Sequence, residues 1–273
     1  MTWRLKTAAL YGTLFLGVAL ALTPLLWMVS ASFMPTGQAS SYPPSLLPSE
    51  VTLEHYRDLF TRLDLGRTLF NSALLATAVT LISLLVNSMA GYGFAKLRFR
   101  GRDRIFRGLL TVLVIPVQVA MLPLFLMMKE LGLVNTYAGA IVPAMASIFG
   151  IFLIRQYALA IPDDLIDAAR IDGAGEFRIY RSVVLPLLAP ILVTLAIFTF
   201  LAVWNDFMWP LIVLTDSDMY TLPVALANLV GEHAQDVELM MAGSVLTVLP
   251  VLALFLALQR YYIEGVMIGS VKG

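Results

Sequence analysis

Long uncharged stretches are the feature of this sequence that most restricts what the chain can fold into. There are six of them, and each is at least 21 residues long. A helix of ~21 residues rises ~31 Å, which matches the ~30 Å thickness of the hydrocarbon core of a bilayer. The six stretches are residues 7–49, 68–95, 108–128, 131–154, 182–205 and 239–259. We therefore predict an all-α membrane protein with six transmembrane helices.

The composition excludes several classes of protein. Hydrophobic residues make up 59% of the 273 residues and charged residues only 13%, about half the ~25% of an ordinary soluble domain. Basic and acidic residues balance at 18 each, so no basic excess indicates nucleic acid as a partner. The chain has no cysteine and no P-loop, and His55 and His233 lie far apart without ligand spacing. We expect no catalytic residue and no metal or cofactor held by this chain itself.

The apolar stretches predict one transmembrane domain over residues 1–273. The first apolar stretch exceeds the ~7 to 15 residues of a signal-peptide core, so we interpret it as a retained helix, although Ala19-Leu20-Ala21 resembles a cleavage site and leaves a signal peptide open. Prolines and serines predict an extended loop over residues 33–49, and helical spacing predicts an amphipathic surface helix over residues 53–63. The predicted spans are residues 8–32, 69–95, 105–128, 137–157, 187–214 and 240–260.

Lysine and arginine gather on one side of the predicted helices. Fourteen of them lie near the two termini and in the loops of residues 96–107 and 155–186, whereas four lie in the opposite loops. Because positive charge marks the cytoplasmic side, we expect both termini and these two loops in the cytoplasm. The last outward loop, residues 215–238, is acidic. Its uncharged part, residues 219–231, is too short to span the bilayer, so it either lies at the interface or inserts into a partner.

The inward loop of residues 161–186 is the one that is not simply a cluster of arginines. Its pattern predicts two short helices broken at Gly173, the first of them capped by Asp163. Asp167 and Arg170 stand at the spacing of a helical ion pair. One side of the first helix is predicted to hold Leu165, Ala168, Ala169 and Asp172, whose small alanines would let a partner approach closely. The residues alone leave two interpretations open, a connecting hairpin and a docking element.

Four motifs resemble one family of membrane proteins. The run D-A-A-R-I-D-G-A (residues 167–174), followed by Leu185-Pro186, resembles the E-A-A-x-x-D-G-A…L-P signature of ABC importer permeases. The segments W-N-D-F-M-W-P (204–210), Y-G-F-A-K-L-R-F-R-G (92–101) and the tail Q-R-Y-Y-I-E-G…G-S-V-K-G (259–273) extend the likeness over most of the chain. Together they are similar to the smaller permease subunit of carbohydrate importers of the maltose type.

The resemblance implies a type I ABC importer permease fold in the inner membrane of a prokaryote. Its implied partners are a second homologous permease, two copies of an ATPase that bind ATP and Mg²⁺, an extracytoplasmic solute-binding protein and membrane lipid. The 161–186 loop is then the ATPase-coupling loop. Asp167 replaces the family's glutamate with a shorter side chain, so its expected salt bridge to an ATPase arginine is weaker or needs a closer approach of the backbone. The coupling residues carried over are Asp167, Ala168, Ala169, Asp172, Gly173, Ala174, Leu185 and Pro186.

Polar residues inside the predicted spans are candidates for a solute path. Asp206 is expected about 15 Å inside the fifth span at helical rise, and an intramembrane carboxylate either faces a cavity or binds a neighbouring helix. Asn205 beside it, Gln118 and Asn87 complete the candidate path; Asn87 shares a helix face with Thr80 and Ser83, a pattern that favours close helix packing first. By position, the resemblance places Gly231, Glu232 and His233 against the solute-binding protein.

Two other functions remain to be weighed against an importer permease. An ion-coupled secondary transporter needs ionisable residues at the midplane and usually repeated halves, but only Asp206 qualifies and no repeat is visible. A membrane-embedded enzyme is opposed by the scarcity of histidine, cysteine and paired carboxylates. The solute cannot be read from these residues: the resemblance implies a sugar, and a polyol, an oligosaccharide or glycerol phosphate fits equally well.

Overall fold

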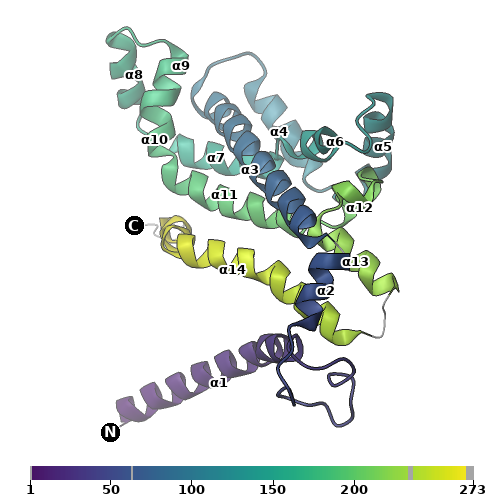
Figure 1. Cartoon of the computed structure of the whole chain (residues 1–273). Helices are drawn as coiled ribbons and strands as arrows, with labels where there is room; N and C mark the ends of the chain where they lie inside the picture. The colour runs from purple at the N-terminus through teal and green to yellow at the C-terminus, as the bar shows by residue number, and fades with distance from the viewer. Residues whose placement is uncertain (1, 63, 233–235, 269–273) are drawn as a thin grey trace. The chain divides into compact units, whose positions relative to one another are not determined.

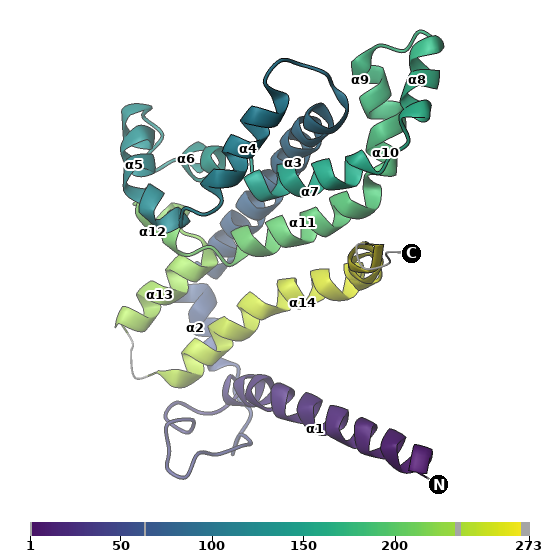
Figure 2. The same ribbon diagram turned by 180° about the vertical axis from the view of Figure 1, so that it is seen from behind.

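The computed structural model of the chain describes residues 2–62, 64–232 and 236–268. Over these residues the regular structure is entirely helical, which confirms the predicted all-α class (Figures 1 and 2). The helices are α1 (Thr2–Ala31), α2 (Glu54–Arg62), α3 (Leu65–Lys96), α4 (Arg102–Val112), α5 (Val117–Glu130), α6 (Tyr137–Ile141), η1 (Val142–Ala144), α7 (Ile148–Leu159), α8 (Asp163–Ile171), α9 (Glu176–Ile179), η2 (Tyr180–Val184), α10 (Leu185–Leu187), α11 (Ala189–Trp204), α12 (Met208–Val213), η3 (Ser217–Met219), α13 (Leu222–Glu232) and α14 (Val237–Ile268).

Three unbroken helical segments are long and apolar enough to cross a membrane: Ala9–Ala31, Leu65–Lys96 and Val237–Ala257. Three further pairs of helices pass the same test together but are bent at a short break. The bends are 104° between α4 and α5, 42° between the α6–η1 segment and α7, and 78° between residues 176–187 and α11. The described residues therefore hold three spans, or up to six if each bent pair is one span.

The breaks follow from proline and from local capping. Pro116 stands directly before α5 and cannot donate the amide that would continue α4. Pro143 lies in the 3₁₀ turn η1, and Ser147 then caps α7 by accepting a bond from the Gly150 amide at 3.2 Å. Pro190 occupies the first turn of α11, where its missing amide hydrogen costs nothing.

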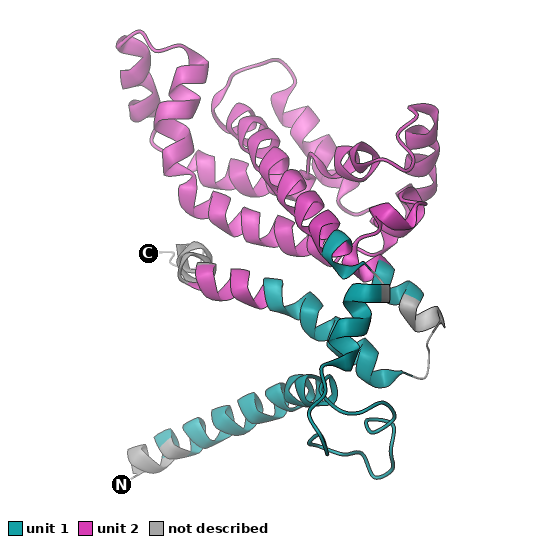
Figure 3. Cartoon of the chain, in the orientation of Figure 1, with its two compact units in different colours: residues 1–67, 225–250 teal, residues 68–224, 251–273 magenta. Residues whose placement is uncertain are grey.

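The chain divides into two compact units (Figure 3). The first comprises residues 1–67 and 225–250, and its core joins the end of α1 to the loop after it and to the start of α14. Buried Glu238 accepts a hydrogen bond from the Ala39 amide at 2.6 Å, and the His55 ring binds the Met34 carbonyl at 2.8 Å. These bonds fix the loop after α1, which the sequence predicted as extended. Helix α2 (Glu54–Arg62) falls within the surface helix that was predicted over residues 53–63.

The second unit comprises residues 68–224 and 251–273. Within it, α3 approaches α7 closely: a Cβ added at Gly91 would meet the Ile154 side chain, and one added at Gly150 would meet the Asn87 amide. Asn87 is fully buried and accepts a hydrogen bond from the Ser147 amide at 3.0 Å. The polar face of α3 therefore serves close helix packing, because small residues and buried amides let two backbones approach.

Candidate functional site

The first helix of the 161–186 loop ends at the glycine that the sequence singled out. Gly173 adopts φ of 78°, a left-handed conformation that glycine adopts without steric cost. Its amide donates to the Arg170 carbonyl and the Ala174 amide donates to the Ala169 carbonyl, both at 3.0 Å, which is the Schellman pattern of a helix end. The predicted start is off by one residue: Pro162 is the N-cap, and Asp163 is the first helical residue.

Two isoleucines anchor this helical pair to the body of the second unit. Ile166 of α8 and Ile179 of α9 are both buried, at 2% and 0% exposure, in one apolar cluster. Ala169 and Ala174 pack against the same cluster. The prediction that Ala169 lies on the partner-facing side of α8 is therefore wrong, because the helical period places it next to Ile166 on the inner side. The cluster comprises Tyr92, Ala95, Ile154, Ala158, Ile161, Ile166, Ile179, Tyr180, Val184, Leu188, Ile191 and Leu195.

The outer side of the pair is apolar and open to solvent. Leu165 is 46% exposed, and Ala168 and Asp172 are also exposed, as the sequence predicted. Two further side chains share this exposure: Ile171 at 87% and Phe177 at 66%. Sequence reasoning did not single these two out. For Ile171 the signal was present, since an apolar residue of α8 that falls outside the inward positions 166 and 169 must face solvent or a partner.

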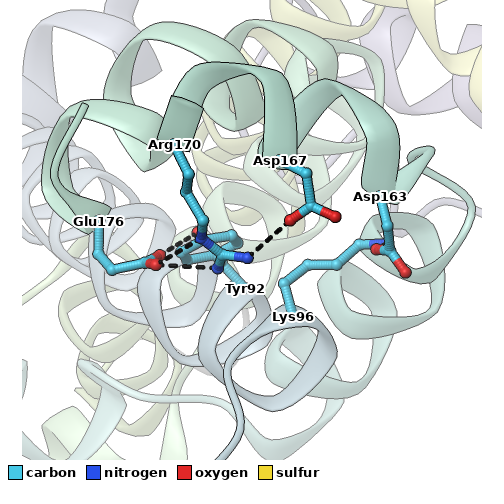
Figure 4. A network of polar contacts seen from close by, with 6 residues as sticks. All are labelled: Tyr92, Lys96, Asp163, Asp167, Arg170 and Glu176. Atoms are coloured by element: carbon cyan, nitrogen blue, oxygen red, sulfur yellow. Dashed lines mark hydrogen bonds and ion pairs between the residues drawn. The ribbon is translucent and has the colours of Figure 1, made fainter. Parts of the chain in front are cut away.

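A network of polar contacts ties α8 and α9 to each other and to the end of α3 (Figure 4). Arg170 donates to Asp167 Oδ1 at 3.0 Å, which confirms the predicted pair, and to Glu176 Oε1 at 2.8 Å. Tyr92 of α3 donates its hydroxyl hydrogen to Glu176 Oε2 at 2.8 Å. The hydrogen bond to Glu176 raises the pKa of Arg170 above its ordinary value, so this cation stays charged. Glu176 was not predicted as a site residue.

A second tether lies at the beginning of α8. Lys96, the last residue of α3, donates to Asp163 Oδ1 at 2.6 Å (Figure 4). It also donates to the Ile161 carbonyl at 2.6 Å. The hydrogen bond and the positive charge of Lys96 lower the pKa of the Asp163 carboxyl below its ordinary value. An open groove of about 1010 Å³ lies between these elements and is lined by residues 95–99, Arg102, Leu159, Asp163, Ile166, Asp167, Arg170 and Glu176.

The end of the loop follows a wide helical turn. Residues of η2 form a π-helical turn that leads into α10. Leu185 packs against the same apolar cluster, whereas Pro186 is exposed. Tyr180 is buried there and its hydroxyl lies 2.7 Å from that of Ser88 on α3. The eight predicted coupling residues thus lie on α8, on the turn after it and on α10, with Ala169, Ala174 and Leu185 turned inward and the others exposed.

The four predicted path residues do not form one site in this chain. Asp206 was predicted to lie inside one continuous helix. That prediction is wrong, because α11 ends at Trp204 and α12 begins at Met208. Asp206 accepts a bond from the Trp209 amide at 3.4 Å and lines a cavity of about 40 Å³. Thr221 lines the same cavity, and its buried hydroxyl has no hydrogen-bond partner among the residues that the structure describes.

The other three predicted path residues lie elsewhere. Asn205 caps α11 and bonds the Leu201 carbonyl, Gln118 is exposed on α5, and Asn87 is buried between helices. Gly231 and Glu232 end α13, although their side chains are not described, and His233 lies outside the described residues. The predicted contact with a binding protein therefore stays a prediction.

Comparisons with known proteins identify relatives along nearly the whole chain. The family model of the binding-protein-dependent transport system inner membrane component matches residues 87–267. The chain is 42% identical to the arabinooligosaccharides transport system permease protein of Halalkalibacterium halodurans, over 93% of this chain and 92% of that protein. It is 33% identical to the lactose transport system permease protein of Rhizobium radiobacter, over 98% and 97%.

A solved structure shares the fold. One chain of a bacterial ABC transporter involved in the import of the acidic polysaccharide alginate superposes with a TM-score of 0.84 at 22% identity. The match covers 95% of this chain and 97% of the matched chain. The permease fold that the four motifs implied is therefore confirmed.

Proposed function

Because this chain belongs to the family of binding-protein-dependent transport system inner membrane components, we propose that it is the permease subunit of an ATP-driven sugar importer. In this proposal the ATPase is a separate subunit, and its movement reaches this chain through the 161–186 loop. The single observation that carries the coupling role is the contrast between the two sides of α8, an anchored inner side and an exposed apolar outer side.

The outer side supplies what an ATPase subunit needs for docking. Leu165, Ile171 and Phe177 offer apolar surface that a monomeric soluble face would not expose together. Asp172 and Asp167 add negative charge beside it. Arg170 already neutralises part of the Asp167 charge within this chain, so apolar burial is expected to contribute more to docking than a salt bridge from Asp167 to the ATPase.

The inner side of α8 and α9 links movement of the 161–186 loop to α3. Lys96 and Tyr92 both belong to α3, a helix long enough to cross the membrane, and they bind the start of α8 and the start of α9. A displacement of the loop would therefore move the end of α3 with it. In the proposed alternating-access cycle, closure of the ATPase dimer pulls the loop, and the helices rock between inward-facing and outward-facing states. The loop must bind the ATPase differently in the two states, since equal affinity shifts no equilibrium.

The remaining partners are proposed on the same basis. A homologous second permease would complete the translocation pathway and cover apolar side chains such as those of α1, which are exposed along most of the helix. A solute-binding protein would deliver the solute from outside, consistent with the description of the family. The excess of arginine and lysine around residues 96–107 and 155–181 supports a cytoplasmic place for the coupling loop in a prokaryotic inner membrane.

The proposed solute is a sugar. Two relatives that match almost the full length of this chain are named for arabinooligosaccharides and for lactose. Among the predicted path residues we retain Asp206, because it lines a small cavity together with the Thr221 hydroxyl, which has no hydrogen-bond partner among the described residues. The cavity of about 40 Å³ is far smaller than a sugar, so Asp206 would meet solute only after the helices rearrange.

The test is transport and ATP hydrolysis by the full importer reconstituted in proteoliposomes. Ile171→Asp should leave the permease folded, because the side chain is 87% exposed, but should weaken retention of the ATPase subunit and reduce solute-stimulated hydrolysis at least about tenfold. Leu47→Asp is the matched control, since Leu47 is equally apolar and exposed but lies in the loop after α1.

Three results would contradict the proposal. One is uptake driven by an ion gradient with no ATPase bound, which would identify a secondary transporter. Another is normal coupling in Ile171→Asp. The third is equal loss in both variants, because a general effect of the added charge would then explain the result.

A further inference from the structure

Five arginines line an open hollow at the turn between α3 and α4. Its volume is about 1100 Å³, and its lining is Arg98, Phe99, Arg100, Gly101, Arg102, Asp103, Arg104 and Arg107. Five positive charges face one negative charge, a net charge of +4. The chain can turn so tightly here because Gly101 adopts φ of 86°. The turn therefore concentrates positive charge around one concave surface.

The aspartate in this hollow neutralises only part of the charge. Asp103 Oδ1 lies 3.2 Å from Arg102 and 3.9 Å from Arg155, and Arg155 also stacks over the Phe106 ring at 4.1 Å. The guanidinium groups of Arg100 and Arg104 make no hydrogen bond or ion pair with any residue that the structure describes. Both side chains are exposed, so they are available to an anion from outside the chain.

Exposed apolar side chains continue directly from these cations. Phe99 is 45% exposed and Ile105 is 51% exposed, and the apolar residues 112–114 at the other end of α4 are exposed as well. Cations and apolar surface thus lie on one helix and the turn before it. A phosphate ion would engage only the arginines, whereas an amphiphile would engage both surfaces.

The position of the hollow along the chain fits the depth of a lipid headgroup. Arg98 and Arg100 follow the last residue of α3, Lys96, by two and four residues. At no more than ~3.6 Å per residue they lie within ~14 Å of the end of a membrane-spanning helix. We propose that this hollow binds the phosphate of an anionic phospholipid, with the acyl chains lying along the exposed apolar side chains of α4. Guanidinium groups suit this ligand because they bind phosphate oxygens in pairs.

The experiment measures lipid binding and does not depend on the proposed transport function. The chain, with its partner permease, is placed in nanodiscs of phosphatidylcholine with or without phosphatidylglycerol, and retained lipid is identified by native mass spectrometry. Arg100→Gln combined with Arg104→Gln should weaken binding of phosphatidylglycerol about thirtyfold, or ~2 kcal/mol at ~1.4 kcal/mol per tenfold. Arg57→Gln combined with Lys129→Gln removes the same charge from exposed sites elsewhere and should leave it unchanged.

Each other outcome overturns the inference. Equal retention of phosphatidylglycerol by the arginine variant and the wild type would show that these cations bind no lipid. Displacement of the retained lipid by inorganic phosphate would identify a phosphate-ion site instead. If the variant retained its lipid but no longer bound an ATPase subunit added to the nanodiscs, the arginines would serve an acidic protein surface. An unchanged unfolding temperature of the arginine variant excludes misfolding as the cause of lost lipid.

Discussion

The ammonium group of Lys96, the last residue of α3, lies 2.6 Å from the carboxylate of Asp163, the first residue of α8. The Lys96 side chain is only 6% exposed, whereas that of Asp163 is 77% exposed. The buried cation also holds the Ile161 carbonyl at 2.6 Å. One side chain at the end of α3 therefore fixes where the 161–186 loop, the proposed coupling loop, begins. This contact leads to the first two predictions.

Replacing Lys96 by methionine should loosen the coupling loop. The change leaves the Ile161 carbonyl without its donor, and an unsatisfied buried acceptor costs about 1 to 3 kcal/mol. We expect faster hydrogen exchange over residues 161–172 and weaker coupling of hydrolysis to transport, while the ATPase still binds through the unchanged outer side. Lys129→Met, at an exposed position on α5, is the control. Unaltered exchange in Lys96→Met would show that the apolar cluster alone positions the loop.

The contact between Lys96 and Asp163 should depend on pH only in acid. Lys96 lowers the pKa of Asp163 in the folded protein, so the stabilisation is present above the ordinary aspartate pKa of about 3.9 and is lost as pH falls through the lowered folded value. Hydrogen exchange of residues 161–166, corrected for the intrinsic pH effect, should therefore stay constant between about pH 5 and 8 and rise below about pH 4. Asp163→Asn should abolish this step; a step near neutral pH in the wild type would contradict the assignment.

Replacing Gly173 by alanine should destabilise the coupling loop because of its backbone and not because of crowding. Gly173 has φ of 78° and nothing lies within 4 Å of an added Cβ, so the expected cost is the ~1 to 2 kcal/mol of a left-handed non-glycine residue. Gly175 is the control, since its φ is −72° and its surroundings are equally open. Thermal unfolding of the two alanine variants should separate them clearly. Equal unfolding temperatures would mean that the turn can adopt another conformation.

Replacing Gly150 by alanine should disturb the contact between α3 and α7. The added Cβ would collide with the buried Asn87 amide, and overpacking of this kind costs about 1 to 3 kcal/mol. Gly108→Ala on α4 meets no atom within 4 Å and should be neutral or slightly stabilising, since alanine favours a helix. The measurement is the unfolding temperature of the purified permease complex. A neutral Gly150→Ala would show that Asn87 can move without loss.

The predicted local structure of the 161–186 loop was correct where local sequence decides and wrong where neighbours decide. The glycine break, the Asp167–Arg170 pair and the exposed Leu165 follow from spacing within one or two turns. Ala169 was misassigned because its inward direction depends on the cluster around Ile166. The tether from Glu176 to α3 was missed because Tyr92 lies 84 residues away in the sequence, and such a pairing leaves no local pattern.

The position of Asp206 shows the same limit. Apart from Asn205, its sequence surroundings are apolar, so hydropathy predicted one span through residues 187–214. The structure instead breaks the helix between Trp204 and Met208 and lets the Asp206 carboxylate accept the Trp209 amide. A carboxylate that accepts a hydrogen bond from a free amide in the first turn of a helix favours a break at that point. A hydropathy pattern does not include this effect.

The sequence by itself determined the class of the protein, the approximate segments that meet the membrane and the loop that carries the family motif. These properties depend on hydrophobicity, charge and capping, which act over a few residues and can therefore be predicted from short stretches of sequence. Only the tertiary structure decided which side of α8 is open to a partner and that Lys96 and Tyr92 tether the loop to α3. These features depend on packing and on pairing between residues far apart in the chain, and both exist only after the helices have assembled.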